Sequence, residues 1–297
     1  MGERKSALVT VFSSGVADVR ERVRDALFAR VAGPDGPRNR ARIHGAPGPR
    51  WFPDGSAIRQ VHGDTAMFVG GLRALLLQSL HPLAMAAVAA HSGYRGDPWG
   101  RLQRTSTFLA VTTFGTAEDA EHAVATVRAV HGRVSGTAAD GRPYRAGDPH
   151  LLKWVHIAEV DSFLRAHQRY GAHPLDDAGC DRYVAETAVV AEKLGVREPP
   201  RTRDELEHAI AEYRPELRGT REAREAARFL LVTPPIPWAA RAPYAVLAAA
   251  GVAMMPMWTR WPLRLPYLPV AEGTAVRLAA GGLVKAVRWA MSAPVPG

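Results

Sequence analysis

The chain has 297 residues, of which 47% are hydrophobic and 23% are charged. This composition is that of a globular protein, and it excludes a wholly disordered chain and a collagen-like repeat. Lysine and arginine (38) exceed aspartate and glutamate (29), and the single cysteine, Cys180, excludes internal disulfides, Cys-x-x-Cys zinc sites and covalent haem attachment through Cys-x-x-Cys-His.

No secretory signal peptide is evident at the start of the sequence. The first charged residues are followed by a broken apolar run without a small-residue cleavage site, which together with the single cysteine predicts a cytoplasmic protein. Residues 33–53 are rich in glycine, proline and arginine and are expected to form a loop or arm. We therefore predict a first segment, residues 1–50, made of an N-terminal helix and this arm.

Helical patterns dominate the middle of the chain. Asp97 and Asp148 each precede a proline, which predicts an N-cap followed by the first helical turn, and Gly195 is typical of a helix end. No run of β-branched residues alternates as a strand would, and no glycine-rich phosphate loop is present. We predict an all-α domain over residues 51–232. The expected helices cover residues 56–80, 82–91, 97–115, 116–134, 148–170, 177–194, 202–213 and 221–231.

Four prolines then interrupt the helical pattern. The most apolar stretch of the chain follows, from Pro243 to Met257, but it is shorter than the ~20 residues of a membrane-spanning helix and is interrupted by Pro256. We predict that residues 233–297 form a helical appendage packed on the same domain. Because Trp258 and Trp261 follow the apolar stretch, peripheral contact with a membrane is kept as an alternative.

Histidines occur on or beside apolar faces at three places. His131 stands in the apolar stripe of its helix, His156 is flanked by apolar residues on the next long helix, and His81 precedes Pro82, where a regular helix is interrupted. A single histidine of this kind is most simply a hydrogen-bonded core residue. Three of them favour iron ligation, because a buried imidazole keeps its lone pair. The stripe around His131 is formed by Ala120, Val124, Val127 and Val134.

One face of the helix that begins at Asp97 combines Arg101, Thr105, Phe108 and Thr112. A buried guanidinium needs an anionic partner, because desolvating it unpaired is costly. A ligand carboxylate such as a haem propionate would serve, and an exposed or salt-bridged Arg101 is the alternative. Protein carboxylates that would serve are Asp64, Asp97 and Asp161.

Three sequence blocks resemble a known family. They are ALLLQSLHPLAMAAVAAHSGYRGDPWGRLQRTSTFLAVTTFG, VRAVHGRVSG and DPHLLKWVHIAEVDSFL. In order and spacing they resemble the rubber-oxygenase (latex-clearing-protein) catalytic domain family, which also includes the fungal prenyl-side-chain oxygenase of mycophenolic acid synthesis. The resemblance covers residues 51–195 closely and the C-terminal third more loosely. It implies a globin-like helical core with additional helices, holding a b-type haem without covalent attachment.

The resemblance also implies roles for individual residues. His131, in VRAVHGRV, matches the axial ligand of the haem iron, and His156 is the second choice for that role. Arg101, Arg104 and Thr105, in RLQRT, match residues at the distal side or the haem propionates, and we expect them to take part in catalysis. The other expected cofactor-binding residues are His81, Phe108 and Asp161.

Two departures from the family pattern bear on the substrate. Rubber-cleaving members have a lysine where Arg104 stands, and that lysine can cap the iron, whereas arginine stays protonated and cannot ligate a metal. Those members also use a glutamate upstream of the RLQRT block as a base, and no glutamate lies between Glu21 and Glu118. We therefore expect haem-dependent oxidation of an apolar small molecule by O2 or peroxide. These departures argue against cleavage of polyisoprene, and the sequence leaves open whether double-bond cleavage is retained.

Other classes of function were weighed against this one. The main alternative is a non-enzymatic, basic helical protein that docks on membranes or partners through residues 238–261. A non-haem metal hydrolase using His81, His131 and His156 lacks an HExxH motif and an acidic cluster. The dispersed positive charge and the lack of a recognised module argue against nucleic-acid binding. The sequence does not determine the substrate, the oxidant, the electron donor or the oligomeric state.

Overall fold

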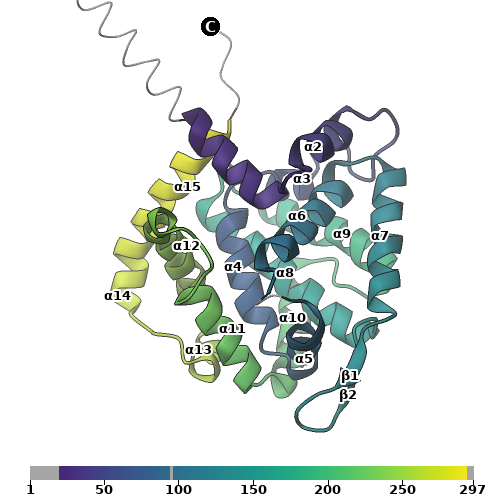
Figure 1. The fold of residues 1–297 in the computed structure, drawn as a ribbon, viewed down its shortest axis with the longest axis vertical. Coiled ribbons are helices and arrows are strands. Elements are labelled where there is room, and N and C mark those ends of the chain that lie inside the picture. Colours follow the sequence, from purple (N-terminus) through teal and green to yellow (C-terminus); the bar gives the residue numbers. More distant parts are fainter. Residues whose placement is uncertain (1–19, 94–95, 293–297) are drawn as a thin grey trace, which may run out of the picture.

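A computed structural model describes residues 20–93 and 96–292 of the chain (Figure 1). The described residues form helices joined by short connections and one antiparallel hairpin, which confirms the all-α prediction. Residues 1–19 of the predicted first segment lie outside the described residues; residues 20–32 are helical.

The elements have the following bounds. The first half of the chain contains α2 (Gly36–Gly45), α3 (Ala57–His62), α4 (Met67–Gln78), α5 (Pro82–His91), α6 (Pro98–Phe114), α7 (Ala117–His131), β1 (Ser135–Thr137) and β2 (Pro143–Arg145). The second half contains α8 (Pro149–Tyr170), α9 (Asp177–Leu194), α10 (Arg203–Tyr213), η1 (Arg214–Glu216), α11 (Arg221–Leu231), η2 (Trp238–Ala240), α12 (Arg241–Ala253), α13 (Met257–Leu263), α14 (Pro269–Ala271), η3 (Glu272–Val276) and α15 (Arg277–Met291).

Helix α8 lies at the centre of the molecule, with α4 packed along it (Figure 1). Trp154 and Ile157 of α8 are fully buried, and further buried residues lie on several sides of the helix, as expected of a helix that is surrounded by others. Gly70 of α4 allows close approach, because a Cβ atom built there would lie 2.8 Å from Cδ1 of Phe163. The packing of α4 on α8 therefore forms the middle of the core.

Most helix ends follow the signals in the sequence. Asp97, Thr116, Asp148 and Thr202 each accept a hydrogen bond from a backbone N–H in the first turn of the helix that follows. Gly195 ends α9 in the left-handed conformation, with φ 106°. These helix starts and this helix end confirm the predictions made from side-chain type.

The segment before α4 differs from the prediction. The expected loop over residues 33–53 contains α2, and the expected helix over residues 56–80 is divided between α3 and α4. Asp64 explains the division, because its carboxylate accepts the backbone N–H of Ala66 at 2.7 Å and that of Ala172 at 3.0 Å. These bonds hold a turn that the apolar pattern did not indicate. Ser56, where the expected helix begins, makes no capping bond.

Between the expected helices over residues 116–134 and 148–170 the structure contains a hairpin, in which β1 and β2 pair. Gly136 lies opposite Tyr144, and the Tyr144 side chain is buried. Three-residue strands give little alternating pattern, so the sequence offered no signal for them.

The C-terminal helices pack on the rest of the chain, with α12 against α4. Arg73 of α4 joins these parts: it donates to the carbonyl of Met254 at 3.0 Å and to Oγ of Ser162 at 2.6 Å. No single helix in the described part is long and apolar enough to cross a membrane, although α4 with α5 and residues 238–253 with α13 reach that composition as sharply bent pairs. The domain boundary at residue 232 stays a prediction.

Candidate functional site

Helices α6 and α7 carry the first group of predicted site residues. They pack against each other near their connection at Gly115, and in Figure 1 they diverge from there, with α8 behind them. Ala120 and Val124 of α7 are buried, Val127 is half-buried, and His131 is the last residue of the helix. The apolar stripe predicted for α7 therefore faces the protein interior and ends at His131.

Two predicted histidines have enclosed ring nitrogens without a hydrogen-bond partner: Nδ1 of His131 and Nε2 of His156. Desolvation lowers the pKa of both rings, that of His156 to about 4, to which Lys153 also contributes. Both imidazoles are thus neutral at pH 7 and keep a lone pair. Enclosed polar atoms without partners are costly, and a bound group that used these nitrogens would remove that cost.

The residues predicted on α6 differ in exposure. Arg101 and Phe108 are half-buried, whereas Arg104 and Thr105 are exposed. The Arg104 guanidinium binds the carboxylate of Asp97 at 3.2 Å. The first turns of α6 therefore present cationic and hydroxyl groups near the surface, and Phe108 lies deeper.

The three carboxylates considered as partners of Arg101 all have arginine partners in the structure. Asp97 binds Arg104, and Asp64 binds Arg288 at 2.7 Å. Asp161 is buried and lies between two arginines of the core, at 2.7 Å from Arg73 and at 2.6 Å from Arg165. The predicted cofactor-binding role of Asp161 stays a prediction, and its contacts with Arg73 and Arg165 give it a place in the core.

A polar group that the sequence analysis did not identify joins α3, α6 and α9. The ring of His62 contacts Oγ1 of Thr113 at 2.8 Å and the hydroxyl of Tyr183 at 3.2 Å. It lies edge-on to Phe163 of α8 at 5.6 Å. Desolvation lowers the pKa of His62 to about 3, so the ring is neutral, and both its nitrogens have partners.

Glu159 was also missed. It stands one turn after His156 on α8, and desolvation raises its pKa to about 7. Desolvation raises the pKa of the Tyr183 hydroxyl, and the charges of Glu159 and Asp161 add to this effect. A glutamate in the apolar run HIAEV, three residues after a candidate histidine, was the signal available in the sequence.

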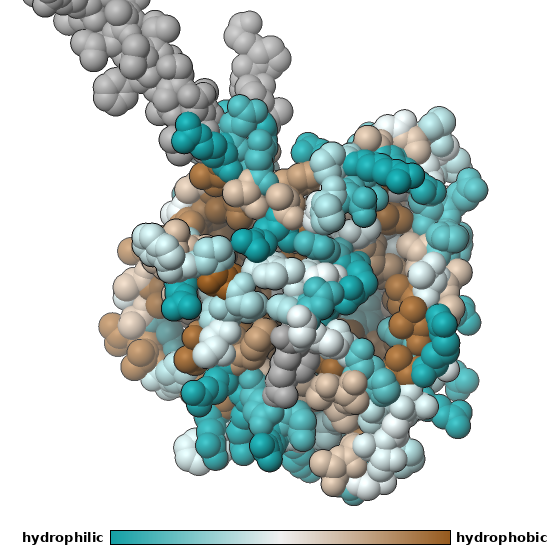
Figure 2. All heavy atoms as spheres, in the orientation of Figure 1, coloured by the Kyte–Doolittle hydropathy of each residue, from teal (hydrophilic) through white to brown (hydrophobic). Residues whose placement is uncertain are grey.

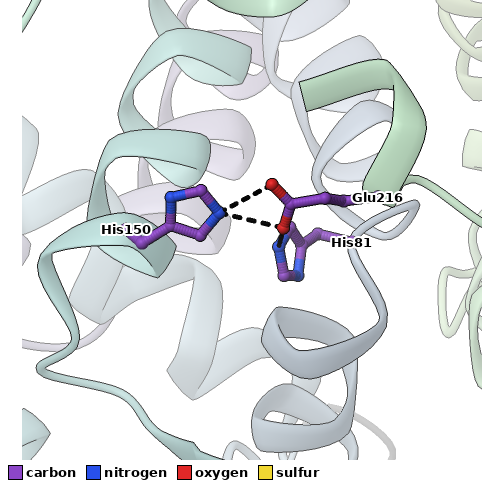
Figure 3. A group of neighbouring side chains, drawn as sticks. All are labelled: His81, His150 and Glu216. Carbon is purple, nitrogen blue, oxygen red and sulfur yellow. Dashed lines mark hydrogen bonds and ion pairs between the residues drawn. The ribbon is translucent and has the colours of Figure 1, made fainter. Parts of the chain in front are cut away.

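His81 lies in a different cluster. Its ring is buried beside His150, with ring centroids 6.0 Å apart, and Nε2 of His81 is 3.3 Å from Oε2 of Glu216 (Figure 3). Nε2 of His150 is 2.9 Å from each oxygen of the same carboxylate. Tyr213 stacks on His150 at 4.5 Å. Neither His150 nor Glu216 was singled out from the sequence, because the three residues meet only through folding.

The structure therefore separates the predicted histidines. Among the described residues, the ligand atoms of His81, His150 and Glu216 lie within 4.8 Å of one another, and His81, His131 and His156 form no such group. The three-histidine site of a non-haem metal hydrolase is not formed. Near His150, a surface cavity of about 330 Å³ is lined by Asp148, Pro149, His150, Lys153 and Arg197.

Comparisons with known proteins agree with the resemblance seen in the sequence. Two relatives, uncharacterized proteins of Mycobacterium bovis and Mycobacterium tuberculosis, are each 32% identical over 162 residues, which cover 52% of this chain and 62% of theirs. The match thus spans about three-fifths of the length of these relatives. No solved structure matches. A family model described as "ER-bound oxygenase mpaB/B'/Rubber oxygenase, catalytic domain" matches residues 59–289, and the chain belongs to this family.

Proposed function

We propose that this protein is a haem b-dependent oxygenase that acts on an apolar small molecule, with His131 as the axial ligand of the iron. The observation that carries the proposal is the position of His131. Its ring ends the inward apolar stripe of α7, with Nδ1 enclosed and without a partner, in a chain that belongs to an oxygenase family.

The residues present fit a haem. Desolvation keeps the His131 imidazole neutral, which iron ligation requires. Phe108, Val127 and His156 are only half-buried although they lie on helices around the core, and Figure 2 shows the surface hollowed between α6 and α7. A planar apolar group bound against these side chains would cover their exposed parts. His156, also with an enclosed and unpartnered nitrogen, is the alternative ligand.

The residues at the start of α6 would bind and orient. Arg101 and Arg104 supply cationic donors for the carboxylates of a haem or for a bound oxidant, and Thr105 supplies a hydroxyl. A haem, when bound, supplies the activation of O2 or peroxide, and the protein sets access and polarity around it. Glu159 on α8 has a pKa raised to about 7, so its carboxyl group could donate or accept a proton near neutral pH.

Absorption spectra of the full chain after haem supplementation test this proposal. We expect a Soret band that His131→Ala weakens or shifts, because the axial ligand is lost. His122→Ala is the matched control, since His122 lies exposed on the same helix and its replacement should leave the spectrum unchanged. A folded wild-type protein that takes up no haem would overturn the proposal. A band sensitive to His156→Ala alone would move the ligand to α8.

A specific observation also supports contact with membranes. Trp238 and Trp261 are 85% and 91% exposed, and residues 233–297 contain six basic residues and one acid, Glu272. That acid is paired with Arg260 at 2.7 Å, so it does not offset the exposed basic groups. The exposed apolar residues of this C-terminal apolar surface are Trp238, Met257, Trp261, Tyr267, Leu268, Val270 and Leu278.

Such a surface suits an interface between water and lipid. Tryptophan and tyrosine favour that boundary, and arginine and lysine attract anionic headgroups. Arg241, Arg264, Arg277 and Lys285 are exposed on the same elements, from α12 to α15. In Figure 2 hydrophobic residues are exposed at the side of the molecule formed by α14 and α15, as they also are near α7. We propose that this surface docks on anionic membranes, where apolar substrates accumulate.

A further inference from the structure

We propose that His81, His150 and Glu216 bind a divalent transition-metal ion such as Zn²⁺, at a site separate from the one proposed for iron. The inference is independent of the haem proposal, because it rests on another cluster of side chains.

The three side chains converge from three elements (Figure 3). His81 precedes α5, His150 lies in the first turn of α8, and Glu216 ends η1. The distances between their facing atoms are 2.9 Å and 3.3 Å for the two histidine-to-glutamate contacts. Ligand atoms around a tetrahedral zinc ion lie roughly 3.3 Å apart. The cluster thus needs only small movements to receive an ion.

Nε2 of His81 is the atom that points to a ligand. The side chain is 1% exposed, and this nitrogen makes no hydrogen bond, although Oε2 of Glu216 is close enough for an ionic contact. Metal ligands are directed at a shared ion and not at one another, which accounts for a short distance without hydrogen-bond geometry.

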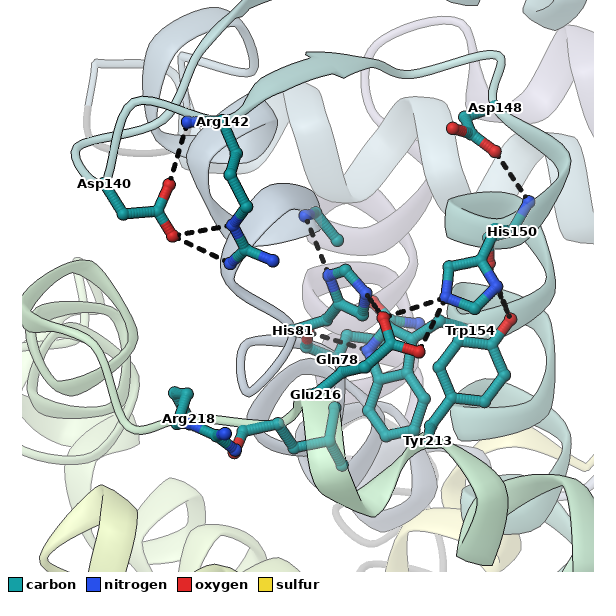
Figure 4. Close-up of polar contacts among 12 residues, drawn as sticks. Gln78, His81, Asp140, Arg142, Asp148, His150, Trp154, Tyr213, Glu216 and Arg218 are labelled. Carbon is teal, nitrogen blue, oxygen red and sulfur yellow. Dashed lines mark hydrogen bonds and ion pairs between the residues drawn. The ribbon is translucent and has the colours of Figure 1, made fainter.

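Nε2 of His150 faces Glu216, and Nδ1 of the same ring faces Tyr213. The hydroxyl of Tyr213 donates to the carbonyl oxygen of His150 at 2.8 Å, and it lies 3.2 Å from Nδ1 of the same residue (Figure 4). Because a carboxylate only accepts hydrogen bonds, Nε2 of His150 donates to Glu216, at 2.9 Å from each of its oxygens. A metal ion would take the place of the Nε2 proton, and the ring would then carry its proton on Nδ1, beside the Tyr213 hydroxyl; a hydrogen bond from the other ring nitrogen is usual for metal-bound histidine.

For His81, metal binding at Nε2 requires the proton on Nδ1. In the structure the backbone N–H of Ala84 points to Nδ1 at a distance of 3.4 Å, a long and weak bond. Binding of the ion would break this weak contact at Nδ1 and form a metal–nitrogen bond at Nε2. Loss of so weak a contact costs little free energy.

The surrounding chain holds the cluster in place. The N–H of Arg218 donates to the carbonyl of Leu80 at 2.8 Å, which fastens the segment after Glu216 beside His81. Trp154 donates to the carbonyl of Gln78 at 3.1 Å (Figure 4). These bonds join the segments around α4, α8 and η1 and hold the three ligands in place before the ion binds. Binding therefore costs little conformational entropy.

The chemistry of the ligands selects the ion. Two imidazoles and one carboxylate favour Zn²⁺, Fe²⁺ or Co²⁺ over Mg²⁺ and Ca²⁺, which prefer oxygen ligands. The side chains of His150 and Glu216 are 51% and 39% exposed, so an ion can enter and water can complete its coordination. The charge of Arg142 also acts on His81, and its guanidinium is paired with Asp140 at 2.8 Å.

Zinc titration of the full, untagged chain by calorimetry tests the site. We expect one Zn²⁺ per chain, with affinity reduced at least tenfold in His150→Gln and in Glu216→Gln, since each removes one ligand. His208→Gln is the matched control, because His208 forms an exposed pair with Glu212 at 3.3 Å on α10. This control should leave the affinity within twofold of the wild type.

Two further measurements keep the test decisive. Co²⁺ should give visible absorption bands typical of nitrogen and oxygen ligands in the wild type, and these bands should be absent in Glu216→Gln. Thermal unfolding without metal shows whether each variant is folded before titration. Zinc binding that is absent, or that is equal in wild type and both ligand variants, would overturn the proposal. A Soret band unaffected by these variants would show that the two sites are independent.

Discussion

Glu159 is the residue whose ionisation bears most directly on stability. Desolvation raises its pKa from 4.5 to about 7. The folded chain therefore binds this proton more tightly than the unfolded chain, and stability falls as the pH rises from about 4.5 to about 7. The full effect, reached above pH 7, is a loss of about 3 kcal/mol at most.

We expect Glu159→Gln to remove this loss. The variant should be more stable than the wild type at pH 8 and should approach it at pH 5, because glutamine imitates the protonated acid. Urea unfolding at both pH values measures the difference, and Glu118→Gln, at an exposed position on α7, is the control. The lowered pKa of His156 has the opposite pH dependence: it reduces stability as the pH falls from about 6.5 to about 4. This effect is the same in the wild type and in Glu159→Gln, so it cancels in their difference. A difference between wild type and variant that does not change with pH would contradict this account.

At the scale of elements, the packing of α4 on α8 depends on Gly70. A Cβ atom there would lie 2.8 Å from Cδ1 of Phe163 and 3.2 Å from Cβ of Ala166, closer than packed carbons allow. The next residue, Gly71, has nothing within 4 Å of such an atom. The two glycines share a helix, but only one of them lies in the helix contact.

We expect Gly70→Ala to destabilise the protein by about 1–3 kcal/mol, because the added methyl group forces α4 and α8 apart. Gly71→Ala should be neutral or stabilising by about 0.5–1 kcal/mol, since alanine favours the helix. The free energy of unfolding in urea measures both. Equal effects of the two substitutions would show that a methyl group at position 70 does not disturb the packing of α4 on α8.

At the scale of the whole molecule, the C-terminal apolar surface predicts membrane binding. The full chain should co-sediment with vesicles of phosphatidylcholine and phosphatidylglycerol more than with phosphatidylcholine alone, and salt should weaken the binding. The double substitution Trp238→Ser and Trp261→Ser should reduce the partition coefficient several-fold, because apolar area no longer enters the interface. Val130→Ser, which changes an exposed apolar residue on α7, is the control. Vesicle binding that is unchanged by the tryptophan substitutions would show that the C-terminal apolar surface is not the membrane-binding site.

Helix type, most helix ends and the inward face of α7 follow from the sequence alone. They depend on neighbours in the chain: Asp97, Thr116 and Asp148 cap the residues that directly follow them, and the stripe ending at His131 repeats with the helical period. The same local patterns, in order, were enough to indicate the family to which the chain belongs. The roles of Arg101, Thr105 and His131 stay predictions that the spectra test.

Tertiary structure alone decided which distant residues meet. The turn at Asp64 depends on the backbone of Ala172, and the contact of His81 with His150 and Glu216 depends on three elements far apart in the chain. The raised pKa of Glu159 likewise depends on the helices that exclude water from it. Periodicity reports only which side of a helix is apolar, whereas the partner on that side is chosen by packing of the whole chain.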